Sequence, residues 1–248
     1  LVSGEGGHSG IRRAMGARLE GREVVTHMCS TYLRCPDLQR LWPHAPGWMH
    51  RIFNRDGESH ILAIDGQELW LHHSIIGPDK SLEQHDHVRA IRNSIGADID
   101  YEILGQERWT ARAMVVDRYR DRRVFLAGDA AHIWIPMGGF GMNAGVEDAV
   151  NLAWKLRAVL QGWGGDALPD SYGEERRAIG QLVAGAAAKI FADLYQVPVD
   201  HPDYEADTPA GAALRADIGA RVTAHNQSEF DSIGMQLGIS YDSSPIVC

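Results

Sequence analysis

The chain has 248 residues, of which 44% are hydrophobic and 23% are charged, and its net charge is −9. This length allows one large domain or two smaller ones, and the composition is that of a globular protein. The acidic balance and the lack of basic runs argue against a nucleic-acid partner. No apolar run is long enough to span a bilayer and no secretory signal is recognised, so we expect a cytoplasmic protein without a membrane partner.

The cysteines and histidines do not form a metal-binding pattern. Cys29, Cys35 and Cys248 have no metal-type spacing, and an odd number of thiols cannot all pair. Free thiols are typical of a reducing compartment. The histidines occur without an HExxH or a paired CxxC motif, so we predict no metal site.

The first part of the sequence is rich in predicted strands. Residues 1–16 are interpreted as a strand end, a glycine turn and a short helix that carries Arg12 and Arg13. Two Asp-Gly turns, at 56–57 and 65–66, separate apolar alternating runs and indicate hairpins. We predict an antiparallel meander of about four strands. Its strands are expected at 22–35, 48–55, 59–65 and 67–75.

A helix is predicted over 81–96, because its apolar spacing fits and Gly96 suits the end. Residues 101–116 return to a strand-like pattern. The stretch RVFLAGD at 123–129 contains a short, wholly apolar strand, which is typical of a parallel sheet buried on both faces. The chain is therefore expected to combine a parallel α/β part with an antiparallel sheet inserted into it.

Two long helices are predicted next, at about 143–161 and 169–195. The first places Val146, Val150, Ala153, Trp154 and Leu156 mainly on one side, and we interpret Trp154 and Lys155 as core and solvated face. A proline-containing loop is expected at 198–210. The tail is expected to hold a strand pair, at 235–241 and 245–248.

The most informative stretch is GDAAHIWIPMGGFGMNAG, residues 128–145. It follows the apolar strand and precedes a helix. Glycines between a strand and a helix let the backbone approach a ligand closely, because no Cβ stands in the way. The N–H groups and the positive dipole end of the helix favour negative charge. The stretch therefore predicts a cradle for a large polar cofactor, although glycine-rich connections without a ligand are common.

Two motifs carry a family resemblance. The stretch GDAAHIWIPMGGFGMNAGVEDAVNLAWKL resembles the GD motif of group A flavoprotein monooxygenases, which are FAD-dependent aromatic hydroxylases. LVSGEGGHSGIRRAMG resembles the DG motif of the same family. Three further stretches resemble the middle sheet of the phenol-hydroxylase branch of this family, namely STYLRCPDL, APGWMHRIFN and ILAIDGQELWLHH. A later segment of that branch is similar to GMQLGISYDSSPIV. The resemblance covers nearly the whole chain.

The resemblance implies which residues bind FAD. Asp129 would bind the ribityl chain, Pro136 would lie near the flavin ring, and the start of the following helix would meet the N1/O2 edge. Glu5, Gly6 and Arg12 would lie near the phosphate path of FAD and NAD(P)H. The full set of cofactor-binding residues implied in this way is Gly128, Asp129, Pro136, Gly139, Gly141, Met142, Asn143, Glu5, Gly6 and Arg12.

The chain departs from the family pattern at three places. Glu5 stands where the family has aspartate, and the later helix motif reads Glu175-Arg176-Arg177-Ala178 without its proline. The N-terminal GxGxxG segment of the family is not found in this sequence. We therefore expect a later part of a longer enzyme, a chain that pairs with a separate chain supplying the N-terminal FAD-binding half, or a homodimer.

The expected fold class is α/β, with part of a Rossmann-like FAD-binding domain and an inserted antiparallel-sheet substrate domain. The expected domain division assigns 1–20 and 105–175 to the partial FAD-binding domain and 21–104 to the inserted sheet. A helical segment and tail, 176–248, would pack on both.

The resemblance implies a monooxygenase that uses FAD, NADPH or NADH, and O2 to hydroxylate a small phenol-like or polycyclic aromatic substrate. Met49, Phe53, Trp70 and His72 are the predicted pocket residues, although packing within the sheet is the commoner role for each of them. The residues single out no catalytic group. Two alternatives remain open, namely a Baeyer-Villiger or epoxidising flavin monooxygenase, and a non-catalytic flavin-fold fragment or binding module.

Overall fold

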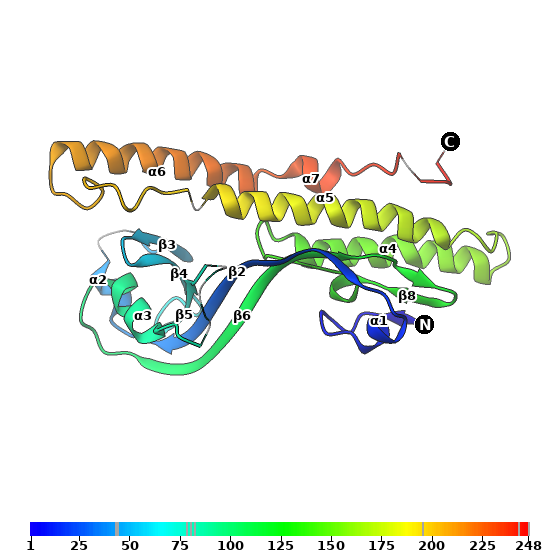
Figure 1. Ribbon diagram of the computed structural model, residues 1–248, viewed down its shortest axis with the longest axis horizontal. Coiled ribbons are helices and arrows are strands. Elements are labelled where there is room, and N and C mark those ends of the chain that lie inside the picture. Colours follow the sequence, from blue (N-terminus) through cyan, green and yellow to red (C-terminus); the bar gives the residue numbers. More distant parts are fainter. Residues whose placement is uncertain are drawn as a thin grey trace. The chain divides into compact units, whose positions relative to one another are not determined.

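The computed structural model describes residues 1–42, 45–77, 79, 81, 83–194, 196–242 and 244–247. The chain divides into two compact units (Figure 1). Unit 1 comprises Leu1–Glu23, Arg112–Gln196 and Arg221–Cys248, and unit 2 comprises Val24–Ala111 and Val197–Ala220. Unit 2 is thus inserted in the sequence of unit 1 at two points.

Unit 1 contains a small sheet of strand order β1-β8-β7 among the described residues. Its strands are β1 (Val2–Ser3), β8 (Val124–Leu126) and β7 (Arg120–Asp121). β1 and β8 run parallel, with Ser3 opposite Leu126, so the turns that follow them leave the same edge of the sheet. The short helix α1 (Gly10–Ala14) begins after the first of these turns, and Ser9 caps it by accepting from the Arg12 N–H.

Helices α4 (Phe140–Leu160) and α5 (Asp170–Leu194) lie side by side in unit 1 (Figure 1). The buried face of α4 is not the one that the apolar pattern indicates. Val146, Val150 and Trp154 are exposed, whereas Asp148 and Lys155 are fully buried. The interpretation of Lys155 as a solvated residue is therefore wrong. The reason is that α5 supplies buried ionic partners for these polar side chains, which hydropathy alone does not reveal.

Unit 2 is built on an antiparallel sheet. Strands β3 (Met49–Asn54), β4 (Gly57–Ala63) and β5 (Leu69–Ile75) form a meander, as predicted for three of its four strands. β2 (Leu19–Arg34) pairs with β5 rather than with its neighbour in sequence. The order of the described sheet is β3-β4-β5-β2-β6-β9, in which β9 (His132–Trp134) belongs to unit 1. β6 (Glu102–Val116) and β2 both pass from one unit into the other.

Helix α3 (His87–Ile95) packs on β4 and β5. Asp86 caps its first turn and Gly96, at φ 73°, ends it in the left-handed conformation. The Asp86 cap explains why the helix begins later than the predicted 81. Together with the short helix α2 (Leu38–Leu41), it covers an apolar core on one face of the sheet. The buried members of this core are Leu33, Cys35, Leu38, Ile61, Trp70, Ile91 and Ile95.

The C-terminal part differs most from expectation. Helix α6 (Pro209–Phe230) was not predicted, and α7 (Ile233–Leu237) occupies part of the stretch expected to form a strand. Residues 244–247 are not in a strand either, and Cys248 lies outside the described residues. α6 has polar residues all around, so its periodicity is weak. A short strand, β9 (His132–Trp134), also divides the glycine-rich stretch and pairs with β6.

Candidate functional site

The two predicted motifs meet at the edge where β1 and β8 end. Arg12 joins them, because its guanidinium donates to the Gly7 carbonyl at 2.6 Å and to the Ala130 carbonyl at 3.0 Å. The side chain is 7% exposed, and burial lowers the pKa of Arg12. Arg12 therefore holds one loop against the other through their backbones.

Glu5 is engaged within its own loop. Its Oε2 accepts from the Ile11 N–H at 3.0 Å and from the Ser9 hydroxyl at 2.7 Å, with the Ser3 hydroxyl at 3.2 Å. The Ile11 and Ser9 hydrogen bonds lower the pKa of Glu5. Gly6, at φ 84°, makes the turn between Glu5 and the helix. A glutamate can thus order this loop as an aspartate would, despite its longer side chain.

The GD turn, which we define as Gly128–Ala131, brings a carboxylate to the surface. It contains a short 3-10 segment, η1 (Gly128–Ala130), and Asp129 is exposed on it. Gly128 is left-handed at φ 58°. A Cβ placed on Gly145 of α4 would lie 3.5 Å from the Gly128 Cα, which is an ordinary van der Waals distance, so the helix packs directly on the turn.

Among the residues that the structure describes, no side chain caps the N-terminus of α4. Gly139 is its N-cap residue, at φ 66°, and provides no side chain, while Gly138 before it is also left-handed at φ 68°. Met142 is 79% exposed. The Asn143 amide donates to the Gly139 carbonyl at 3.0 Å. The first N–H groups of α4 are therefore available to an external acceptor at the positive end of the helix dipole.

The predicted residues of this motif lie together. Asp129, Pro136, Gly139, Met142 and Asn143 are all exposed on the turn and on the first turn of α4. Gly128 and Gly141 are partly buried beside them. An anionic or carbonyl-bearing ring edge can accept from the N–H groups of α4 while ligand hydroxyls donate to Asp129.

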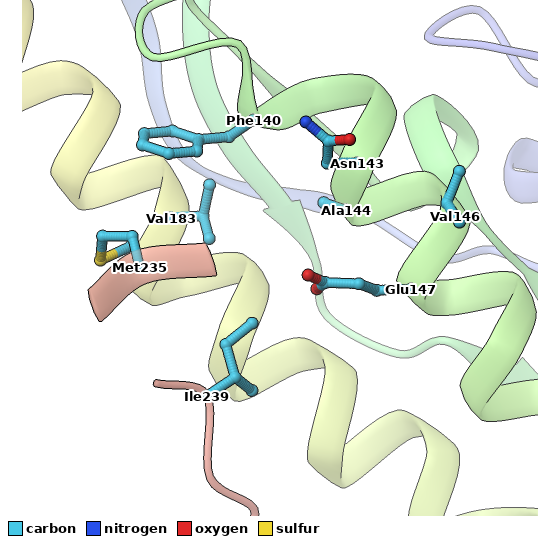
Figure 2. A pocket seen from close by; sticks show the side chains of 8 residues that line it. All are labelled: Phe140, Asn143, Ala144, Val146, Glu147, Val183, Met235 and Ile239. Atoms are coloured by element: carbon cyan, nitrogen blue, oxygen red, sulfur yellow. The ribbon is translucent and has the colours of Figure 1, made fainter. Parts of the chain in front are cut away.

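A cavity of about 240 Å³ adjoins the same helix (Figure 2). Figure 2 shows side chains from α4, α5 and the α7 region around it. Asn143 and Glu147 provide polar atoms, and the other lining groups are apolar. The lining residues are Phe140, Asn143, Ala144, Val146, Glu147, Val183, Met235 and Ile239. The cavity is smaller than a typical cofactor site, and it lies beside the candidate site on the same helix.

Behind the GD turn lies a buried polar cluster that the sequence did not reveal. Asp148 Oδ2 accepts from the Gly128 N–H at 2.8 Å and lies 2.9 Å from His132 Nε2. Asp148 Oδ1 accepts from Arg176 Nε at 2.7 Å. His132 stacks on Trp134 with ring centroids 4.3 Å apart. No sequence signal marks this cluster, because Asp148 and Arg176 have the pattern of ordinary charged residues on amphipathic helices.

The four predicted pocket residues lie on opposite faces of the unit 2 sheet. Trp70 is fully buried in the core under α3, and its Nε1 donates to the Cys35 carbonyl at 3.0 Å. His72 is also fully buried, 2.9 Å from Ser94 Oγ. Trp70 and His72 are therefore packing residues, and their assignment to a pocket with Met49 and Phe53 is corrected. Side chains alternate along a strand, and sequence alone does not say which face is covered.

The opposite face carries a polar row. Strand register places Arg51 beside His60, His60 beside His73, and His73 beside Ser30. Ser30 Oγ lies 2.7 Å from His73 Nδ1 and accepts from Trp109 Nε1 at 2.8 Å. The same register places Met49 next to Leu62 and Leu71 on one side of the row, and Phe53 next to Glu58 on the other. This face, not that of Trp70, offers a few polar groups among apolar ones, as ligand sites do.

Burial sets the charge state of this face. Desolvation lowers the pKa of His60 to about 3, with the Arg51 cation as the next cause, so the imidazole is neutral at physiological pH. Desolvation also lowers the pKa of His73. Burial raises the pKa of Glu58 to about 7, which makes its carboxyl a hydrogen-bond donor for part of the time at neutral pH.

Comparison with known proteins agrees with the motif geometry. Residues 1–187 match the family model described as FAD binding domain. A Streptomyces halstedii protein named as a polyketide hydroxylase is 35% identical over 89% of this chain and 41% of its own length. The FAD-dependent monooxygenase apdD of Emericella nidulans is 30% identical over 98% of this chain and 42% of its own length.

Solved structures give the same result. RebC with bound 7-carboxy-K252c has a TM-score of 0.87 and 30% identity, and the match covers 100% of this chain and 46% of RebC. Aklavinone-11 hydroxylase in complex with FAD and aklavinone has a TM-score of 0.70 and 30% identity, covering 81% of this chain and 38% of that one. The chain thus spans less than half the length of these proteins.

The fold and the motif geometry define an FAD-dependent monooxygenase fold. Within that class, the chain belongs to the FAD binding domain family. The resemblance to FAD-dependent aromatic hydroxylases and the expected mixed α/β fold are confirmed. No helix within the described residues has the length and apolar character needed to cross a membrane. Among those residues there is also no cluster of His, Cys, Asp or Glu able to hold a metal ion.

Proposed function

We propose that this chain takes part in the hydroxylation of a phenol-like or polycyclic aromatic compound, with FAD as cofactor and NADPH or NADH as reductant. One observation carries the proposal. The uncapped N-terminus of α4 and the exposed carboxylate of Asp129 lie together in a glycine-lined motif of the FAD binding domain family. The names of the relatives support the aromatic substrate, since they include aklavinone 12-hydroxylase and tetracenomycin B2 monooxygenase-dioxygenase.

The residues of the GD turn and α4 fit a flavin. We propose that Asp129 accepts hydrogen bonds from the ribityl hydroxyls, and that the N–H groups of Gly141, Met142 and Asn143 donate to the pyrimidine edge of the ring. The uncapped helix end suits that edge, because negative charge there is stabilised by the dipole. Pro136 and Gly139 would line the approach. Bound FAD, once reduced, supplies the oxygen-activating chemistry, while the chain supplies position and electrostatics.

Glu5, Gly6 and Arg12 have a supporting part in this proposal. Arg12 and Glu5 already bind backbone and hydroxyl groups of the chain, so their effect on the cofactor phosphates is through the shape of the loop. Because the Glu5 carboxylate is already hydrogen-bonded within its own loop, the remaining backbone N–H groups of that loop are the donors that a phosphate would meet.

We further propose that unit 2 is the substrate domain and that the Arg51–His60–His73–Ser30 face contacts the aromatic substrate. Its neutral imidazoles can hydrogen-bond to a phenol oxygen, and Met49, Phe53 and Leu71 offer apolar surface for a ring. A cytoplasmic location is part of the same proposal, since Cys29 and Cys35 are free thiols.

The test is oxidation of NADPH and NADH by the chain supplemented with FAD, with and without phenols and polycyclic aromatic polyketides. Hydroxylation predicts substrate-dependent oxidation and a product heavier by one oxygen atom. The position of that oxygen distinguishes ring hydroxylation from insertion beside a ketone. Binding of FAD without any substrate-dependent oxidation would reject the enzymatic part of the proposal and leave a binding module.

A further inference from the structure

Two buried ionic clusters join α4 to α5, and they differ in what else they contact. In the first, Lys155 Nζ lies 2.6 Å from Glu175 Oε2. Asn151 and Ser244 donate to the same carboxylate, each at 2.6 Å. All of these contacts are with helix or tail residues. The first cluster therefore fastens α4, α5 and the tail together.

The second cluster, around Asp148, also holds the GD turn. Asp148 is fully buried and Arg176 is 1% exposed. One carboxylate oxygen accepts from Arg176, and the other accepts from the Gly128 N–H and contacts His132. Arg176 is fixed in turn by Glu147 at 2.9 Å and by the Tyr241 hydroxyl at 3.1 Å. A charge on α5 is thus linked through Asp148 to the first residue of the turn.

We propose that Asp148 is a positioning residue for the cofactor site, which acts through the backbone of Gly128 and the ring of His132. This inference rests on the proposed function. By holding Gly128 in its left-handed conformation, Asp148 sets the direction in which Asp129, the next residue, leaves the sheet. By holding His132, it fixes the ring on which Trp134 stacks, in the strand that leads to α4.

A carboxylate is required at position 148 because its neighbours are donors. The Gly128 N–H and Arg176 Nε can only donate, and His132 Nε2 donates in the tautomer that a carboxylate favours. An asparagine has nearly the same shape but offers an acceptor on one side only. If its oxygen faces Arg176, its NH2 group faces the Gly128 N–H. Two donors then oppose each other in a buried place, and the turn must move.

The chain provides a matched control. Asp148→Asn and Glu175→Gln each convert a buried carboxylate between α4 and α5 into the isosteric amide. Both carboxylates have donors around them, and both are ion-paired. Only Asp148 contacts the GD turn. A purely structural role predicts the same result for the two variants, whereas a positioning role predicts different ones.

The experiment measures three quantities on the 248-residue chain and on both variants. Thermal unfolding gives the loss of stability. Hydrogen exchange of the amides at 127–134 reports the order of the GD turn. Flavin fluorescence on titration with FAD gives the dissociation constant.

We expect Asp148→Asn to speed exchange in the GD turn and to weaken FAD binding by at least about tenfold, since hydrogen bonds to charged groups contribute enough for such a factor. Glu175→Gln should lower the melting temperature by a similar amount and leave both other quantities within about twofold of the unaltered chain. Equal effects of the two variants on exchange and on FAD binding would overturn the proposal. If the unaltered chain binds no FAD, the proposed function is wrong for this chain, and the exchange result alone decides the positioning role.

Discussion

Unit 2 should lose stability in mild acid because its core holds a neutral histidine. His72 lies under α3, beside Ser94 and Ser74, with no solvent exposure. Desolvation lowers the pKa of His72 to about 3 from 6.5, and His73 and His85 add to the effect. In the unfolded chain the imidazole regains its ordinary pKa. Between these two values the unfolded state binds a proton that the folded state does not.

The sign and size of the effect follow from this difference. Stability is fully present above pH 6.5 and is lost as the pH falls toward the folded-state pKa of about 3. The slope approaches about 1.4 kcal/mol per pH unit below the unfolded-state pKa, which makes the loss about 2 kcal/mol between pH 6.5 and roughly pH 4.5. His60 has a similarly low pKa of about 3 and should contribute a second proton of the same sign.

The assay is urea unfolding at several pH values, followed by the fluorine NMR signal of 5-fluorotryptophan at Trp70. Trp70 belongs to the same core as α3, so its signal reports unit 2 even if unit 1 unfolds separately. His72→Gln should reduce the slope of unfolding free energy against pH by about one proton, or about 1.4 kcal/mol per pH unit. His8→Gln, at an exposed position, is the control. An unchanged slope in His72→Gln would refute the reasoning.

Three further predictions follow from buried charges and from one tight strand contact. Glu58→Gln should stabilise unit 2 by about 1–2 kcal/mol above pH 7 and have little effect below pH 4.5, because the pKa of Glu58 is raised to about 7 and the buried carboxyl is favoured only while it is protonated. Unfolding at about pH 8 and pH 4 checks this prediction. A gain in stability at both pH values would contradict it. Lys155→Met should lower the free energy of unfolding by about 3 kcal/mol, since it leaves the Glu175 carboxylate buried without its cation. In a double-mutant cycle, adding Glu175→Met should recover part of this loss. Strictly additive effects of the two substitutions would argue against the pair. Gly21→Ala should lower the free energy of unfolding by on the order of 2 kcal/mol, because Gly21 has φ 129° and a Cβ there would lie 2.3 Å from the Ala113 carbonyl oxygen. An unchanged melting temperature would show that the two strands can adjust to the added methyl group.

The parts of the fold that depend on local sequence could be predicted. The Asp-Gly turns place β3, β4 and β5 correctly, and Gly96 ends α3 as its position predicts. The apolar VFL strand pairs in parallel with β1, as its lack of alternation indicates. The GD stretch has a recognisable pattern because glycines, a carboxylate and a helix start occur in a fixed order.

The remaining features depend on partners that are distant in sequence. Nothing near Lys155 or Asp148 announces that Glu175 and Arg176 will be buried beside them. For the same reason the exposed Val146 and Val150 were placed on the predicted apolar side. The alternation of side chains along a strand can be predicted for both Trp70 and Met49, but only the position of α3 decides which face of the sheet belongs to the core. Helix α6 lacks an apolar stripe, so periodicity could not identify it.

The proposed flavin site consists of the GD turn and the start of α4. The most direct test is the visible absorption spectrum of the purified chain after incubation with FAD and removal of free cofactor, with the released cofactor identified after denaturation. If this site binds flavin, the chain shows a flavin spectrum and releases FAD, and both are lost in an Asp129→Ala variant that remains folded. A chain that stays colourless under these conditions would show that the GD turn and α4 do not form a flavin site in this chain.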